Sequence, residues 1–469
     1  MIVLMRRGVG ALCAVALTAC SLTMPPSSVT APAPVDWNAP LPHGGSLTDL
    51  REWWKAQNDP ILVALIDGAQ ALSPTVAVAL NRVETARANE ATAQAALLPG
   101  VTAGLSAGRS VSLPATPAAT STAVTLQTSW EIDVFGAARV ARVAAAGQTQ
   151  GSQAQWHDAR VSVAAEVAST YYALAHCWKV HALAEQDLAS RQRSRDISAR
   201  SLQAGMLAPA AYAQVQAEVA QSQLRLIQQS SQCDLHTKAL VALSGEDEAL
   251  VRSVMRALVL PDDLTGFSVT RIPAQALVQR PDVFAAEHDV ALASAQIGRA
   301  KARRWPGLSL GGSIGALRYG SAGVDTDITT WSFGPLALTL PVFDAGQRAA
   351  MVDAATADYV AAVASYRAKV RQAVREVEEA LVVLDSTVQR EMDTRAVHDA
   401  RLQNLGAAQN RERNGLASAL EVEEARRALL AARADVLSLQ LERKRAWVAL
   451  YRAAGGGWER PAPEPAPQP

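Results

Sequence analysis

Two long stretches of the chain, residues 136–204 and 345–414, contain no proline and are rich in Ala, Gln, Arg and Glu. This composition favours α-helix, and a continuous helix of that length would extend roughly 100 Å at about 1.5 Å per residue. Helices of ordinary globular domains are much shorter. The sequence therefore predicts long helices packed side by side rather than one compact core.

Both long stretches begin at the same kind of junction. The first follows "WEIDVFGAAR" and the second follows "TLPVFDAGQR", so that each passes through Val-Phe and a glycine. Before each junction lie two alternating segments, the first of which opens on Pro-Gly, and such segments are typical of transmembrane β-strands. The sequence predicts two strand-to-helix junctions, marked by Phe135, Gly136, Phe343 and Gly346.

Both long stretches also end in the same way. Gly205 and Gly415 stand where a helix hairpin needs a residue in the left-handed conformation. The Pro-Gly pairs, the Val-Phe pairs and these glycines recur at separations of 207, 208 and 210 residues. This constancy indicates an internal duplication. Residues 59–98 and 208–245, with 273–304 and 416–453, predict half-length helices that complete each half.

The composition excludes several classes of protein. Apolar residues make up 49% of the chain but aromatic residues only 5%, and Lys+Arg and Asp+Glu are both 44. This charge balance gives no indication of a nucleic-acid partner. The chain shows no hydrolase triad, phosphate loop or nucleotide fingerprint, so we expect neither an enzyme, a metal site nor a cofactor.

The N-terminus predicts export. Paired arginines and a short apolar run in "MRRGVGALCAVALTAC" form an export signal that is too short for a membrane span. Leu-Thr-Ala-Cys resembles the bacterial lipobox, which predicts a covalent lipid on Cys20; the alternative is an ordinary signal peptide with an unrelated cysteine. Ser21 favours the outer membrane by analogy with lipoprotein sorting. A Pro/Ser/Ala-rich tether should follow in an extended conformation.

No later segment has eighteen uncharged apolar residues in a row, so we expect no membrane-spanning helix. A chain of this kind could span a membrane only as a closed barrel. Four strands cannot close one, and a single chain cannot bury both faces of such long helices. The sequence therefore requires an oligomer.

Cys13 leaves with the signal and Cys20 is the predicted lipidation site, so two further cysteines remain, Cys177 and Cys233. Their midpoint is Gly205, so a helix hairpin folded there brings them to one level. In an oxidising compartment they would form a disulfide; the alternative is two buried free thiols. A metal site with His181 and His236 would be strained, because the two histidines fall on opposite sides of the cysteines.

The chain resembles the TolC family of outer-membrane efflux proteins, in its lipoprotein branch, which is the outer-membrane component of RND-type pumps and includes nodulation-protein-T-like chains. "RPDVFAAEHDVALASAQIGRAKARRWPGLSL" carries the most specific resemblance, supported by "PVFDAGQR" and "RNGLASALEVEEARRAL". The resemblance implies a mainly α, internally duplicated fold with a transmembrane β part. Three chains of four strands would close a 12-stranded outer-membrane β-barrel, continuous with a long periplasmic α-helical barrel.

The resemblance also implies a periplasmic gate. Leu420 would form an apolar ring, and Arg411 and Glu424 would make closing ion pairs within or between protomers. The alternative is that Leu420 is a helix-seam residue and that the two charges are ordinary surface groups. The hairpin ends at Gly205 and Gly415 would dock a periplasmic adaptor.

The implied function is passive conduction of small toxic solutes or drugs, in a homotrimer that docks with an adaptor and an inner-membrane pump. One alternative is the exit duct of a type I protein secretion system, and another is a structural coiled-coil lipoprotein that links outer membrane and cell wall. The expected organisation is a signal peptide, a lipidated tether, two efflux repeats and a Pro-rich disordered tail, at residues 1–19, 20–52, 53–265, 266–454 and 455–469.

Overall fold

The computed structural model describes residues 23–32, 53–111, 117–257, 280–458 and 460–461. The signal segment, Cys20, most of the predicted tether and most of the predicted tail lie outside them. The chain forms two compact units. One contains the strands with residues 80–154 and 284–369, and the other contains both helix hairpins.

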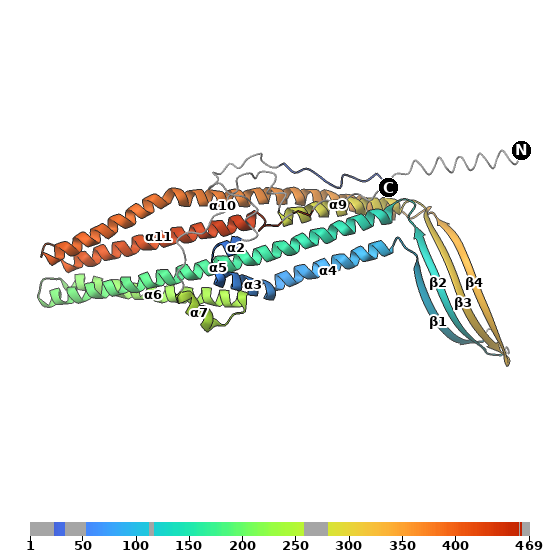
Figure 1. The fold of residues 1–469 in the computed structure, drawn as a ribbon, viewed down its shortest axis with the longest axis horizontal. Coiled ribbons are helices and arrows are strands. Elements are labelled where there is room, and N and C mark those ends of the chain that lie inside the picture. Colours follow the sequence, from blue (N-terminus) through green and yellow to red (C-terminus); the bar gives the residue numbers. More distant parts are fainter. Residues whose placement is uncertain (1–22, 33–52, 112–116, 258–279, 459, 462–469) are drawn as a thin grey trace. The chain divides into compact units, whose positions relative to one another are not determined.

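The first unit holds one antiparallel sheet in the order β1-β2-β3-β4 (Figure 1). The strands are β1 (Gly100–Ser110), β2 (Ala119–Ile132), β3 (Gly307–Ser321) and β4 (Val324–Thr339). The two repeats join where β2 pairs with β3. Ala322 and Gly323 both have positive φ and make the tight two-residue turn between β3 and β4. The four predicted strands are confirmed, two from each repeat.

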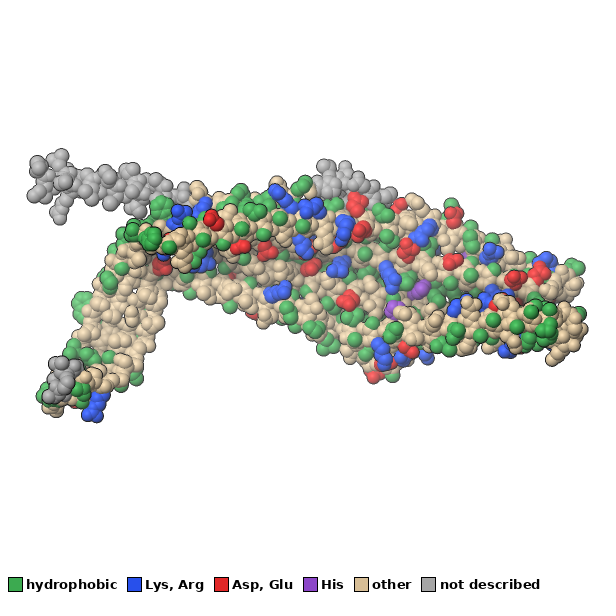
Figure 2. Space-filling model, turned by 180° about the vertical axis from the view of Figure 1, so that it is seen from behind, with side chains coloured by type: hydrophobic (Ala, Val, Ile, Leu, Met, Phe, Trp, Pro, Cys, Tyr) green, Lys and Arg blue, Asp and Glu red, His purple; other side chains and the backbone are tan. Residues whose placement is uncertain are grey.

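The sheet carries no charged side chain along most of its length. Its charged residues stand near strand ends, where Arg318 pairs with Asp325 at 3.0 Å, and the face seen in Figure 2 is correspondingly poor in charge between its ends. Large apolar side chains such as Leu105, Trp331 and Phe333 are 75–85% exposed. Large exposed apolar side chains grouped on one element mark a site of contact with another protein or with lipid.

The two long helices are confirmed. α5 (Ala137–Gln203) and α10 (Gln347–Arg413) each have 67 residues. α6 (Pro209–Ser244) returns beside α5, and α11 (Ala419–Ala453) returns beside α10 (Figure 1). Proline at the first position of α6 is preorganised for a helix start. Ser418 caps α11, because its hydroxyl accepts a hydrogen bond from the Glu421 N–H at 3.2 Å.

One half-length helix was predicted wrongly. Residues 59–98 form two helices, α3 (Pro60–Leu72) and α4 (Pro74–Ala95), with Ser73 extended between them. Pro74 is the cause, because the residue before a proline is disfavoured in the helical region. No single described helix is both long and apolar enough to cross a bilayer; α3 and α4, bent by 53° at their break, reach that length and composition only together.

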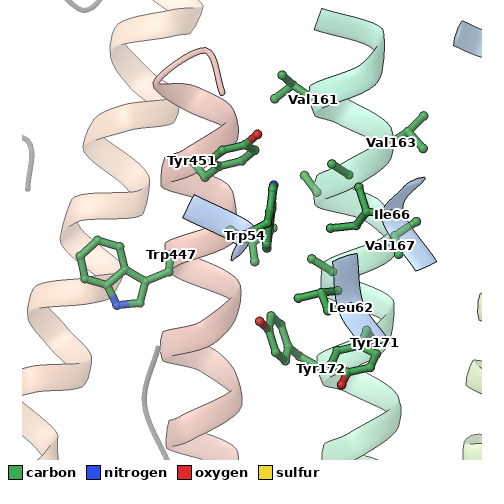
Figure 3. Close-up of a cluster of buried hydrophobic side chains, with 14 of the residues drawn as sticks. Trp54, Leu62, Ile66, Val161, Val163, Val167, Tyr171, Tyr172, Trp447 and Tyr451 are labelled. Atoms are coloured by element: carbon green, nitrogen blue, oxygen red, sulfur yellow. The ribbon is translucent and has the colours of Figure 1, made fainter. Parts of the chain in front are cut away.

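Short helices complete the second unit, where the main core lies. α2 (Trp53–Ala56) and α7 (Glu248–Ala257) were not predicted. Trp54 and Leu62 lie between α5 and α11 (Figure 3), and the rings of Trp54 and Tyr451 meet edge to face at 4.9 Å. Asp59 caps α3 and also accepts a hydrogen bond from the buried Tyr171 hydroxyl at 2.7 Å. These contacts fasten α2 and α3 to the long helices.

The distinctive "RPD" sequence has a structural role at the start of α9 (Pro281–Ala302). Arg280 is 6% exposed and binds both carboxylate oxygens of Asp282. Its guanidinium also donates to the Ala453 carbonyl at the end of α11 and pairs with Glu376 of α10 at 2.8 Å. One buried side chain therefore joins three helices, and its charge is compensated by two carboxylates.

Candidate functional site

The first predicted junction is a tight, capped turn. Gly136 has φ +76°, which favours glycine, and α5 begins at the next residue. The Asp133 carboxylate accepts a hydrogen bond from the Arg139 N–H at 2.9 Å and so satisfies a donor in the first helical turn. Phe135 stacks on Trp305, with ring centroids 5.8 Å apart. The strand thus turns directly into a long helix.

The second junction uses the same chemistry with a looser entry. Gly346 has φ +89°, and the Asp344 carboxylate accepts from the Gly346 and Arg348 N–H groups at 3.1 and 3.3 Å. Phe343 is 89% exposed, unlike its counterpart in the first repeat. Both helices are therefore started by an aspartate, although the sequence analysis named only the aromatic residues and glycines.

The hairpin ends are rigid turns. Gly205 and Gly415 have φ +72° and +70°, as expected for residues that end a helix in the left-handed conformation. The Gly205 N–H donates to the Leu202 main-chain carbonyl and the Met206 N–H donates to the Ser201 main-chain carbonyl, both at 2.9 Å. The corresponding two bonds close the turn at Gly415. The paired bonds satisfy carbonyls that would otherwise be free at the helix ends.

Both hairpin ends carry an exposed apolar side chain immediately after the glycine. Met206 is 78% exposed and Leu416 is 75% exposed. A large apolar side chain on a rigid exposed turn is suited to contact with a partner. The same position is used in both repeats.

The structure gives Arg411 a partner other than the predicted Glu424. Arg411 pairs with Glu421 inside the chain, not with Glu424. Glu421 is the nearer residue because it lies in the first turn of α11, almost one turn closer to the loop than Glu424. Leu420 is 38% exposed and stays available to a neighbouring chain. The pairing of Arg411 with Glu424 within one chain is therefore corrected; a pairing between chains remains a prediction.

A stronger ion pair lies one residue before Glu424. Glu423 is 6% exposed, and its carboxylate accepts from the Arg193 Nε and Nη2 at 2.9 and 3.2 Å. Arg426 approaches the same carboxylate at 3.3 Å. Bidentate pairs of this kind fix geometry as well as charge. The pair joins α5 of the first hairpin to α11 of the second.

Serine hydroxyls extend this contact. Arg427 of α11 donates to Ser194 Oγ at 3.0 Å and to Ser190 Oγ at 3.4 Å, both on α5. The Ser190 hydroxyl in turn donates to the Glu423 main-chain carbonyl at 3.3 Å. We call the set Arg193, Ser190, Ser194, Glu423 and Arg427 the interhairpin lock.

Electrostatics keep the lock charged at neutral pH. Burial by itself would raise the pKa of the Glu423 carboxyl, but hydrogen bonding with Arg193 and Ser190 and the charges of Arg193 and Arg426 outweigh it and lower that pKa. The carboxylate is therefore ionised throughout the neutral range.

The lock was not predicted from the sequence, because the resemblance directed attention to Glu424 and not to Glu423 of "EVEE". A signal was present on the other helix, where Ser190, Ser194 and Ser198 recur every four residues and are all at most 7% exposed. A buried polar stripe on one helix predicts a polar partner on its neighbour. Its partner helix could not be read from the sequence.

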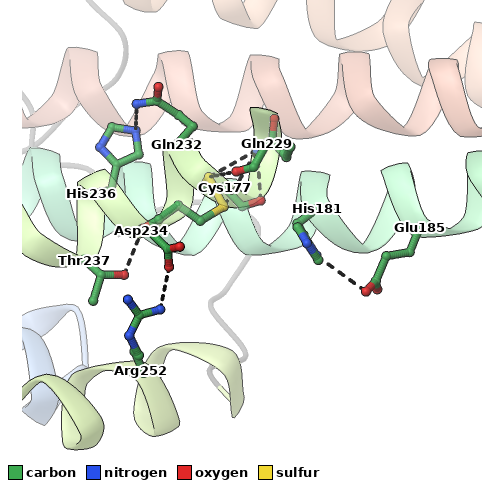
Figure 4. Close-up of a disulfide and its surroundings, with 10 residues drawn as sticks. Cys177, His181, Glu185, Gln229, Gln232, Asp234, His236, Thr237 and Arg252 are labelled. Carbon is green, nitrogen blue, oxygen red and sulfur yellow. Dashed lines mark hydrogen bonds and ion pairs between the residues drawn. A yellow bond between two sulfur atoms is a disulfide. The ribbon is translucent and has the colours of Figure 1, made fainter. Parts of the chain in front are cut away.

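The structure joins Cys177 and Cys233 in a disulfide between α5 and α6, with their Cα atoms 5.5 Å apart (Figure 4). Both side chains are at most 3% exposed. The Gln229 amide donates to the Cys177 carbonyl at 3.2 Å. Both sulfurs are used in the disulfide, and His181 and His236 lie on opposite sides of the disulfide. Among the described residues no group of His, Cys, Asp and Glu side chains forms a metal cluster.

The sequence matches the family described as "Outer membrane efflux protein" over residues 65–246 and 272–456. It is 31% identical to the outer membrane protein OprJ of Pseudomonas aeruginosa, with 96% of each chain aligned. It is also 31% identical to the pyoverdine export outer membrane protein OpmQ of Pseudomonas putida, with 95% of this chain and 96% of that one aligned.

Solved structures agree with the sequence match. The fold is similar to that of the outer-membrane channel OprN, with a TM-score of 0.80 and 26% identity over 93% of this chain and 99% of that one. It is also similar to the open state of the Neisseria gonorrhoeae MtrE outer membrane channel, with a TM-score of 0.75 and 25% identity over 93% of this chain and 98% of that one. The chain belongs to the family of outer-membrane efflux proteins, which are channels of the outer membrane and not enzymes.

Proposed function

We propose that this chain is the outer-membrane exit duct of a tripartite efflux pump and conducts small solutes passively. The relatives include proteins named for pyoverdine export and for solvent efflux, which supports small molecules over polypeptides as cargo. The observation that carries the proposal is the continuity of the chain: each long helix begins a few residues after a strand of the apolar sheet and ends at a rigid hairpin turn.

The proposed assembly is a homotrimer. β1 and β4 are the edges of the four-stranded sheet, and unpaired edges are satisfied when a sheet closes on itself. Three copies supply twelve strands for one barrel in the outer membrane. The α-helices would then enclose a periplasmic duct, with the outer face of the sheet against lipid.

The proposed gate lies near the hairpin ends. Leu420 would form an apolar ring with its counterparts, and Arg411 and Glu424 would pair across the chain boundary. The interhairpin lock holds α11 to α5 within each chain. Polar contacts are suited to a gate that opens. A partner that binds the open state better than the closed state can shift the equilibrium between them.

The proposed partners are a periplasmic adaptor and an inner-membrane pump of the RND type. The adaptor docks at the turns around Gly205 and Gly415, where Met206 and Leu416 project. We further propose that Cys20 is the lipidated first residue of the mature chain, in the outer membrane, after removal of residues 1–19. The two repeats, 53–265 and 266–454, and the tail 455–469 complete this organisation.

The test is efflux by a strain that lacks its own duct. Wild-type chain should restore export of a fluorescent pump substrate, and Met206→Asp with Leu416→Asp should abolish it while leaving the amount in the outer membrane unchanged. Leu250→Asp is the matched control, because Leu250 is 53% exposed on α7, outside both hairpin ends. Unchanged efflux by the double variant would contradict docking at these turns.

A second readout separates the alternatives. Purified protein in planar bilayers should conduct ions, whereas a structural coiled-coil lipoprotein would give no channels. Restoration of polypeptide secretion without solute efflux would favour the type I secretion duct instead.

A further inference from the structure

The N-terminal segment is fastened to the first unit. Residues 23–31 were predicted as part of an extended tether. They lie beside α9 and α10 (Figure 1), and three of their main-chain carbonyls accept hydrogen bonds from side chains of these helices. Lys301 donates to the Thr23 carbonyl at 2.6 Å, and Ser294 donates to the Pro25 carbonyl at 2.7 Å. The Tyr359 hydroxyl of α10 donates to the Pro26 carbonyl at 2.9 Å. The segment therefore connects two helices.

The sequence "TMPP" suits this binding. Pro25 and Pro26 have no N–H, so these two residues present only acceptors, and their rings fix φ. A proline also restricts the residue before it to extended conformations. Less conformational entropy is then lost when the segment binds, because the unbound chain is already extended.

The helix surface is shaped for the same segment. Gly298 of α9 is buried, and a β-carbon built there would lie 2.5 Å from the Met24 sulfur. A side chain at this position would therefore have to displace the Met24 side chain from its present place. Ser294, one turn before Gly298, is 2% exposed although its hydroxyl serves the segment. A buried donor and a missing side chain, one turn apart, form a fitted surface for residues 23–26.

We propose that α9 and α10 form a specific docking site for residues 23–26, and that this site holds the N-terminal segment independently of any lipid. The site stands just before β3, since Lys301 precedes the strand by only six residues. Cys20 is three residues from Thr23, a reach of at most about 11 Å. This last step rests on the proposed lipidation: the acyl chains would be held beside the membrane end of α9, where the sheet begins.

The test uses the full chain in cells with a diazirine amino acid in place of Met24. Irradiation should give an adduct between this position and the α9 peptide that contains Gly298, identified by mass. Gly298→Leu fills the space beside Met24 and should remove the adduct. Gly406→Leu is the matched control. Gly406 is a helical glycine like Gly298, but no atom lies near its β-carbon position, so this variant should leave the adduct yield unchanged.

Removing the donors tests the site without filling it. Ser294→Ala, Lys301→Ala and Tyr359→Phe should each weaken docking by about fivefold, the equivalent of one hydrogen bond. The triple variant should therefore lose nearly all of the adduct. An adduct that is absent from the wild type, or equally strong in Gly298→Leu, would overturn the proposal.

Dependence on the lipid is tested separately. Cys20→Ser, exported with a leader that is cleaved without lipidation, should give the wild-type adduct yield. Loss of the adduct in that variant would show that the lipid, and not the helix surface, holds the segment. None of these measurements requires transport, so failure of the proposed efflux function would leave their outcome unaffected.

Discussion

The two helix hairpins share one backbone plan but differ in what holds their helices together. α5 and α10 are equal in length, and each ends at a glycine with the same turn. In the first hairpin Cys177 and Cys233 are covalently joined. The positions 210 residues later are Thr387 and Arg443, and there Arg443 donates to the Thr387 carbonyl at 3.0 Å. The duplication kept the contact and changed its chemistry.

This difference indicates which hairpin can change shape. A disulfide between two helices resists their separation at that level, whereas hydrogen bonds can be exchanged for water. The second hairpin holds its helices with ion pairs, among them Arg443 with Glu391 and Arg390 with Glu442, each at 2.7 Å. We expect the first hairpin to act as a fixed wall and the second to move.

The largest effect should come from deleting the disulfide. Cys177→Ala with Cys233→Ala opens a loop of 56 residues, and the free energy of unfolding should fall by up to about 4 kcal/mol from the chain-entropy term. Chemical unfolding followed by helical circular dichroism measures it. The single variant Cys177→Ala is the control, since it loses the same bond. A loss below about 1 kcal/mol would mean that helix packing already fixes the hairpin.

The second test transfers the disulfide to the other hairpin. Thr387→Cys with Arg443→Cys should form a bond at the equivalent level, gaining up to about 4 kcal/mol while losing about 2 from the arginine contacts. Glu391 keeps its pair with Arg395. Bond formation is read from mass without reduction, and efflux should fall. Full efflux with the bond formed would show that the second hairpin need not part there.

A smaller effect is expected at the interhairpin lock. Glu423→Gln keeps the shape but removes the charge that Arg193 binds, and should weaken the contact between α5 and α11 by about 1–2 kcal/mol. Leak conductance in planar bilayers should rise. Asp435→Asn is the matched control, because it makes the same acid-to-amide change on α11 at an exposed side chain.

The same contact should depend on pH. Because the folded pKa of Glu423 lies below its ordinary value of 4.5, its stabilising contribution is complete above that value and is lost as pH falls through the folded pKa. Leak through the wild type should therefore rise below about pH 4.5, whereas leak through Glu423→Gln should change little over that range. Equal pH dependence of the two proteins would assign the effect to other groups.

The smallest effect is expected for Arg411→Ala. Arg411 and Glu421 are 50% and 42% exposed, and an exposed pair contributes about 0–1 kcal/mol. Loss of the Arg411–Glu421 pair within one chain should therefore hardly change leak conductance. A large increase would show that Arg411 also binds a neighbouring chain, as the predicted gate requires.

The secondary-structure elements and their repetition could be predicted from the sequence. Uninterrupted runs of helix-forming residues predicted α5 and α10, because local preference summed over many residues is decisive. Gly205 and Gly415 predicted the turns, since positive φ is a local property of glycine. The symmetric spacing around Gly205 predicted that the two cysteines meet, because residues at equal separations from a hairpin turn lie at the same level on its two helices. The break at Ser73 could also have been predicted, since the residue before a proline is disfavoured in the helical region.

The contacts between side chains of different elements could not be predicted in this way, because they depend on how the elements pack. Glu423 and Glu424 are alike in composition and adjacent in sequence, yet one is buried against Arg193 and the other is exposed. Their difference depends on how α11 is rotated against α5, which no local rule fixes. The docking of the N-terminal segment could not be predicted either. Its site includes the space beside Gly298, and that space is recognised as a site only when the Met24 side chain lies in it.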